Sequence, residues 1–119
     1  MSKKILLVED NEEILYANRV MLELEGYDIL IAQTAKEGKK LAREETPDLI
    51  VLDVMLPDAD GIKFCEELQK EGNFRILFLS ALGTAESTLR AMKAGGYGYV
   101  SKPYLMQTLL QKIEESLNV

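Results

Sequence analysis

Short apolar runs alternate along the chain with segments whose apolar residues recur at helical spacing. The first run, at 5–8, has charged residues on both sides and branched side chains, which is typical of a strand buried on both faces. The segment that follows keeps helical spacing until Gly26 ends it. The same alternation predicts strands at 5–8, 27–32, 49–52, 76–79 and 97–100, and helices between 11 and 26 and at 34–44, 61–71, 84–94 and 104–117.

Five strands alternating with five helices predict a parallel sheet covered by helices on both faces, because parallel strands need helical crossovers. Right-handed crossovers leave few windings, and the doubly wound order 2-1-3-4-5 is the most economical of them. A chain of 119 residues is close to one average domain of roughly 150. We therefore expect residues 1–119 to form a single α/β domain, with ligands bound at the carboxyl ends of the strands.

Composition narrows the chemistry that is available to this domain. The chain has 14 Lys and Arg against 20 Asp and Glu, a net charge of −6, which disfavours binding to nucleic acid or to an anionic membrane. One cysteine, Cys65, excludes an intramolecular disulfide and a cysteine zinc site. The absence of histidine excludes Ser–His and Cys–His pairs, histidine-bound metals and a histidine phosphoacceptor. Because no apolar run has a membrane-spanning or signal-peptide length, we expect a cytoplasmic protein.

Acidic residues follow two strands that are neighbours in the expected order. Glu9 and Asp10 come after the first strand, and Asp53 closes the third. At a separation of ~5 Å and an effective dielectric constant of ~20, each like-charge pair costs about 3 kcal/mol. Three pairs approach the stability of a whole small domain, so a compensating cation is needed. Oxygen ligands without histidine favour a hard ion, and an incomplete protein shell favours Mg²⁺ over Ca²⁺.

Each of these residues also has a structural explanation. Glu9 and Asp10 serve equally well as solvated helix caps, whereas Asp53 closes an apolar strand and is hard to solvate without a partner. Ser80 ends the fourth strand and Lys102 follows the fifth, so both lie on the same edge of the sheet. Ser80 is equally explained as a turn residue, and Lys102 as an ion-pair partner of the acids.

Several short motifs point to one family. They are Leu-Val-Glu-Asp-Asn at 7–11, Leu-Asp-Val-Met-Leu-Pro-Asp at 52–58, Gly61, Ser-Ala at 80–81 and Ser-Lys-Pro at 101–103. In these motifs, and over essentially its whole length, the chain resembles the receiver domain of bacterial two-component response regulators, the chemotaxis regulator among them. The resemblance implies a flavodoxin-like fold of the same strand order. It also implies a phosphorylation-dependent switch, not an enzyme, which catalyses only its own phosphorylation and dephosphorylation.

The resemblance assigns a role to each acidic residue. Asp53 is implied to accept a phosphoryl group from a sensor histidine kinase or a histidine phosphotransfer protein. Mg²⁺ is implied as the cofactor, with Asp10 as a direct ligand and Glu9 acting through water. Asp53 and the backbone carbonyl of Met55 are implied as the other protein ligands.

The resemblance also implies the parts of a switch. Lys102 bonds the phosphoryl group, Ser80 is the switch hydroxyl and Tyr99 the switch aromatic, and the Lys102–Pro103 peptide bond is cis. On phosphorylation Ser80 moves toward the new oxygen and Tyr99 fills the space. A downstream protein or a fused output domain would read the altered surface. Met55 and Leu82 are apolar at positions that tune phosphoryl lifetime, so we expect slow self-dephosphorylation.

Three other functions were considered. A flavodoxin-like cofactor-binding domain would need a Ser/Thr-rich phosphate loop where Glu9 and Asp10 stand. A Mg²⁺-dependent phosphohydrolase would need an acid two residues after Asp53, where Met55 stands. A receiver that is never phosphorylated would not need the complete set of acids, hydroxyl and lysine. Whether the domain acts alone or within a longer chain is open at this stage.

Overall fold

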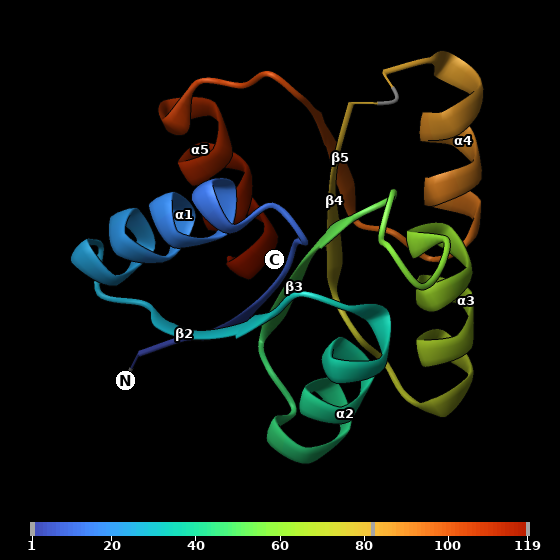
Figure 1. Ribbon diagram of the computed structural model, residues 1–119, viewed down its shortest axis with the longest axis horizontal. Helices are drawn as coiled ribbons and strands as arrows, with labels where there is room; N and C mark the ends of the chain where they lie inside the picture. The colour runs from blue at the N-terminus through green and yellow to red at the C-terminus, as the bar shows by residue number, and fades with distance from the viewer. Residues whose placement is uncertain (1, 82, 119) are drawn as a thin grey trace.

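The computed structural model describes residues 2–81 and 83–118 and contains five strands and five helices (Figure 1). The strands are β1 Lys4–Val8, β2 Asp28–Ala32, β3 Leu49–Asp53, β4 Ile76–Ser80 and β5 Gly98–Ser101. The helices are α1 Glu12–Leu24, α2 Ala35–Glu45, α3 Gly61–Glu71, α4 Ala85–Lys93 and α5 Met106–Leu117. Every element expected from the sequence is present. The ends differ slightly: α5 begins at Met106 instead of 104, because Leu105 is still in an extended conformation.

The five strands form one parallel sheet in the order β2-β1-β3-β4-β5, which confirms the predicted winding. The register pairs Val8 with Leu52, and Ser80 with Ser101. The carboxyl ends of β1, β3, β4 and β5 therefore reach the same edge of the sheet. This edge carries the candidate site.

Alternate residues of the central strands face opposite sides of the sheet, so each side has its own apolar core. Leu6 and Ile50 pack with α2, α3 and α4 on one face, around Phe64 of α3. Ile5 and Leu49 pack with α1 and α5 on the other. Figure 1 shows the two sets of helices on opposite sides of the strands.

Local sequence signals at the helix starts act as expected. Asn11 caps α1, since its side chain accepts a hydrogen bond from the Ile14 N–H at 3.1 Å. Thr34 caps α2 by accepting from the Glu37 N–H at 3.2 Å. These caps fix where each helix leaves the sheet edge that bears the acidic residues.

Cys65 is fully buried on the inner face of α3. Its thiol donates a hydrogen bond to the Ala94 carbonyl at 3.4 Å. Burial raises the pKa of the Cys65 thiol to about 11, so the reactive thiolate is not populated near neutral pH. Within residues 2–81 and 83–118, no helix has the length and apolar character needed to cross a bilayer.

Replacing the largest side chain of the α3 core should destabilise the fold. We expect Phe64→Ala to lower the free energy of unfolding by about 3–5 kcal/mol, because a fully buried aromatic ring leaves a cavity. Urea unfolding followed by circular dichroism measures this difference. Leu24→Ala, an apolar truncation at a 77% exposed position of α1, is the control and should change the same quantity by less than about 0.5 kcal/mol. Equal losses in the two variants would contradict the assigned core.

Candidate functional site

Three carboxylates and one lysine meet at the carboxyl edge of the sheet. Glu9 and Asp10 follow β1, Asp53 ends β3, and Lys102 follows β5. One oxygen from each acid lies within 4.8 Å of the other two. Glu9 and Asp53 are only 4% and 6% exposed, whereas Asp10 is open to solvent. The structure thus confirms that the residues predicted to converge do so.

Lys102 bridges the two buried acids. Its ammonium donates to Oε1 of Glu9 at 2.5 Å and to Oδ2 of Asp53 at 2.8 Å. Its backbone N–H donates to the Ser80 carbonyl at 2.8 Å, which fixes where the side chain starts. The peptide bond that follows, Lys102–Pro103, is cis, as the resemblance implied.

The charges in this cluster do not balance. One ammonium faces three carboxylates, which leaves two negative charges. Burial raises the pKa of Glu9 above its usual value, and the neighbouring charge of Asp53 adds to this, against the opposing effect of the Lys102 hydrogen bond. Burial alone would lower the pKa of Lys102, but its hydrogen bonds to Asp53 and Glu9 raise it. Ionised Glu9 therefore destabilises the folded protein, and Lys102 stays charged.

The loop between β3 and α3 folds back as a tight hairpin beside Asp53. Met55 forms an isolated antiparallel bridge with Asp60. Two backbone hydrogen bonds flank this bridge, from the Gly61 N–H to the Val54 carbonyl at 2.7 Å and from the Leu56 N–H to the Ala59 carbonyl at 3.3 Å. Neither bond uses the Met55 carbonyl, and the Met55 N–H donates to Oδ1 of Asp53 at 2.9 Å.

Gly61 makes this return possible. A Cβ atom at this position would lie 2.3 Å from the Asp53 carbonyl oxygen and 2.8 Å from the Cα of Val54. Both neighbours are backbone atoms that cannot rotate away, so only glycine fits without moving the end of β3. The backbone of Asp53 is thus held by its strand on one side and by Gly61 on the other.

The donor set fits a hard divalent cation. Its side-chain ligands are oxygens only, and two net negative charges are left after Lys102. One carboxylate is exposed, where water would complete the coordination shell of a bound ion. Glu9, Asp10 and Asp53 could hold such an ion. Mg²⁺ is compatible with this arrangement.

Ser80 and Tyr99, the predicted switch pair, lie on adjacent strands near this edge. Ser80 is fully buried at the end of β4. Tyr99 is half-buried in β5; its hydroxyl lies 3.2 Å from Oγ of Ser87, and its ring centroid lies 6.3 Å from that of Phe78. Leu82, the other residue expected to tune phosphoryl lifetime, lies outside the described residues.

Ser87 is not among the residues predicted from the sequence. Ser87 is buried on α4 and ties the Tyr99 hydroxyl to that helix. It precedes the buried Ala91 by four residues, so helical spacing alone places both on the inward face. The signal was present but weak, because serine is common near helix starts for capping reasons.

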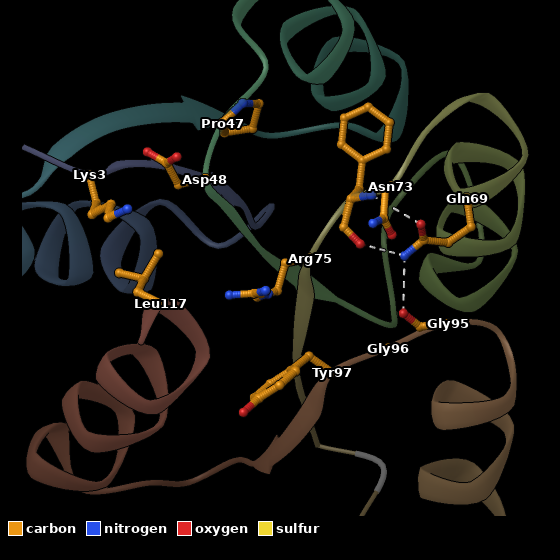
Figure 2. Close-up of a pocket in the computed structure, with 11 residues that line it drawn as sticks. Lys3, Pro47, Asp48, Gln69, Asn73, Arg75, Gly95, Gly96, Tyr97 and Leu117 are labelled. Carbon is orange, nitrogen blue, oxygen red and sulfur yellow. Dashed lines mark hydrogen bonds between the residues drawn. The ribbon is translucent and has the colours of Figure 1, made fainter. Parts of the chain in front are cut away.

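A cavity of about 700 Å³ opens at the opposite edge of the sheet (Figure 2). It is lined by Lys3, Pro47, Asp48, Gln69, Asn73, Phe74, Arg75, Gly95, Gly96, Tyr97 and Leu117. The Gln69 amide bonds the backbone of Phe74 and Gly95, and Arg75 donates to the Ser116 carbonyl and stacks over Tyr97. These side chains thus hold loops together, and none of the predicted site residues reaches the cavity.

Neutralising Glu9 should stabilise the metal-free protein at neutral pH. The folded-state pKa of Glu9 is raised above 4.5, so the stability from its protonated form is complete below that pH and is lost as pH rises through the raised value. Glutamine stays neutral throughout. We therefore expect Glu9→Gln to become more stable relative to the wild type as the pH rises from below 4.5 to 7. The measurement is the difference in the free energy of unfolding between the two proteins, determined by urea unfolding in EDTA.

Glu44→Gln, the same substitution at an exposed position of α2, controls for the loss of one negative charge. An equal gain in the two variants at pH 7 would contradict the burial cost assigned to Glu9. So would a Glu9→Gln protein that is less stable than the wild type at that pH.

Comparison with known proteins places the chain among regulatory proteins. It is 43% identical over 105 residues to the alkaline phosphatase synthesis transcriptional regulatory protein PhoP of Bacillus subtilis (strain 168), covering 87% of this chain and 44% of that protein. The chain thus spans less than half the length of this relative.

Solved structures agree. A CheY-like response regulator receiver domain protein from Methanospirillum hungatei JF-1 matches with a TM-score of 0.94 at 33% identity, over 99% of this chain and 95% of that one. The non-phosphorylated HemR receiver domain from Leptospira biflexa matches with a TM-score of 0.93 at 33% identity, over 99% and 96%.

The sequence pattern of the response regulator receiver domain matches residues 5–114, which include all of the acidic site and both residues of the predicted switch pair. Strand order, helix placement and the site at the carboxyl edge agree with that match. The chain therefore belongs to the receiver domains of two-component response regulators, which are phosphorylation-dependent signalling domains and not conventional enzymes.

Proposed function

We propose that Asp53 is the phosphoacceptor of this receiver, and that a phosphohistidine on a sensor histidine kinase or a histidine phosphotransfer protein is the donor. The observation that carries the proposal is the placement of the Asp53 carboxylate, buried at the strand end with Oδ2 on the Lys102 ammonium. A carboxylate oxygen of Asp53 attacks phosphorus, the phosphorus–nitrogen bond breaks, and the donor imidazole leaves with the electron pair. Because residues 1–119 contain no histidine, the donor histidine lies outside this receiver.

The chain's own residues supply positioning and charge. Glu9, Asp10, Asp53 and the Met55 carbonyl would hold Mg²⁺, which when bound neutralises charge on the phosphoryl oxygens. Lys102 contributes a point charge. Once Asp53 carries the phosphoryl group, the Lys102 ammonium moves from the Asp53 carboxylate to a phosphoryl oxygen. The Met55 N–H holds Oδ1 of Asp53, which leaves the other oxygen as the nucleophile.

The phosphoryl group would act through Ser80 and Tyr99. The Ser80 hydroxyl moves to bond a phosphoryl oxygen, and Tyr99 fills the space that it leaves. For this Tyr99 must give up its 3.2 Å hydrogen bond with Ser87, so the contact between β5 and α4 changes. A partner that reads the α4 and β5 surface would then detect phosphorylation.

Residues 1–119 form, in this proposal, one cytoplasmic receiver unit that passes the signal to an output domain or a separate protein. The length of the relative PhoP and its role as a transcriptional regulatory protein support an output domain on the same chain. The net charge of −6 supports signalling through protein contacts, with neither nucleic acid nor membrane bound by this unit itself.

The acceptor assignment is tested by labelling. Incubation with Mg²⁺ and a small phosphodonor such as acetyl phosphate should add one phosphoryl mass to the wild-type protein, as seen by intact-protein mass spectrometry. Asp53→Asn and Asp53→Ala should remain unlabelled, whereas Asp28→Asn, which changes an exposed acid on β2, should be labelled like the wild type. Label on the Asp53 variants, or none on a folded wild type, would overturn the assignment.

The phosphorylated protein should be long-lived. The Met55 side chain is 57% exposed beside the site and has no polar group to orient an attacking water. Once the donor is removed, we expect a half-life of minutes or longer in Mg²⁺, measured by loss of label. Met55→Asn should shorten it, and Leu24→Asn, an equal change on distant α1, should not. A wild-type half-life of seconds would refute the expectation.

A further inference from the structure

One carboxylate joins the tip of the β3–α3 loop to the start of α2. Oδ1 of Asp58 accepts a hydrogen bond from the Ala35 N–H at 2.8 Å, and Oδ2 accepts from the Lys36 N–H at 3.2 Å. These are the first two residues of α2, whose N–H groups have no partner within a helix. A charged acceptor at the positive end of a helix makes a strong contact of this kind. The loop tip is thus attached to an element more than twenty residues away in the chain.

This contact differs from the ordinary cap of the same helix. Thr34, the residue just before α2, accepts from the Glu37 N–H at 3.2 Å and has no hydrogen bond to the β3–α3 loop among those that the structure describes. Asp58 and Thr34 thus both satisfy N–H groups of the first turn, but only Asp58 ties that turn to the loop. Substitutions at Thr34 and Asp58 can therefore distinguish the effect of losing a helix cap from the effect of losing the loop anchor.

The anchored loop leads directly to the site. Asp58 stands at the tip of the hairpin whose base is closed by the Met55–Asp60 bridge and by the bond from Gly61 to Val54. Asp53 itself is fixed by β3, whereas Met55 lies outside the strand and is positioned by this hairpin and by its N–H bond to Asp53. Moving the tip would rotate the Met55 peptide groups, whose N–H bonds Oδ1 of Asp53.

We propose that Asp58 is a positioning residue: by fixing the loop tip to α2, it sets the Met55 carbonyl and the Asp53 carboxylate for the divalent cation. The inference rests on the proposed function above, in which both groups hold Mg²⁺. Asp58 itself touches neither the acid cluster nor Lys102 in the contacts described. The hydrogen bond from Ala35 also holds the pKa of the Asp58 carboxyl below its usual value, so the anchor keeps its charge at neutral pH.

The test is a direct Mg²⁺ titration of the metal-stripped protein by isothermal calorimetry, with no phosphodonor present. Asp58→Ala should raise the Mg²⁺ dissociation constant about tenfold, the low end of the losses seen when groups that orient metal ligands are removed. Asp58→Asn, which keeps one acceptor oxygen, should fall between it and the wild type. Thr34→Ala, the matched control, should leave the dissociation constant within about twofold of the wild type while lowering the urea midpoint.

A second measurement separates positioning from general destabilisation. In labelling with acetyl phosphate, Asp58→Ala should need more Mg²⁺ for half-maximal rate but should reach the wild-type rate at saturating Mg²⁺. A merely less stable protein would lose active fraction at every Mg²⁺ concentration.

Each other outcome counts against a stated claim. An unchanged dissociation constant in Asp58→Ala and Asp58→Asn overturns the positioning role. Equal increases of the dissociation constant in Asp58→Ala and Thr34→Ala would assign the effect to the start of α2, and would also overturn the positioning role. The wild type should bind Mg²⁺, and Asp10→Asn should abolish that binding. If either result is not obtained, the metal site of the proposed function fails and this inference fails with it. The first two results leave the proposed function intact.

Discussion

The Lys102 ammonium holds together two buried carboxylates that would otherwise repel each other. Its contacts of 2.5 Å to Glu9 and 2.8 Å to Asp53 join the segment after β5 to the ends of β1 and β3. Because two negative charges remain uncompensated, the site favours a further positive charge. The cation binding and the phosphoryl chemistry that we propose both depend on this one charge imbalance.

The parallel topology brings these charged residues together. In the order β2-β1-β3-β4-β5 every strand ends at the same edge, so polar residues placed after strands gather there. Apolar cores lie on both faces of the sheet, and Glu9 and Asp53 are buried at its carboxyl edge. Gly61 then brings the start of α3 against the Asp53 carbonyl. The like charges at this edge destabilise the fold, and apolar burial in the two cores offsets that cost.

The acidic site was predictable because each of its residues stands directly after a strand. Glu9, Asp53 and Lys102 needed only the strand order to be brought together, and the strand order followed from the alternation of elements. The roles of Ser87 and Asp58 could not be predicted in the same way. Their partners, Tyr99 and the start of α2, lie in other elements, and no local pattern encodes such a contact.

The sequence alone thus determined the class of fold, the strand order, the chemistry of the site and the exclusion of histidine from it, since all of these depend on local periodicity and residue type. The tertiary structure made Asn11 the α1 cap, buried Glu9 and Asp53 while leaving Asp10 exposed, and directed the Lys102 ammonium to both buried acids. The physical reason is that burial, hydrogen bonding and the pKa of a carboxyl depend on neighbours brought together only by packing.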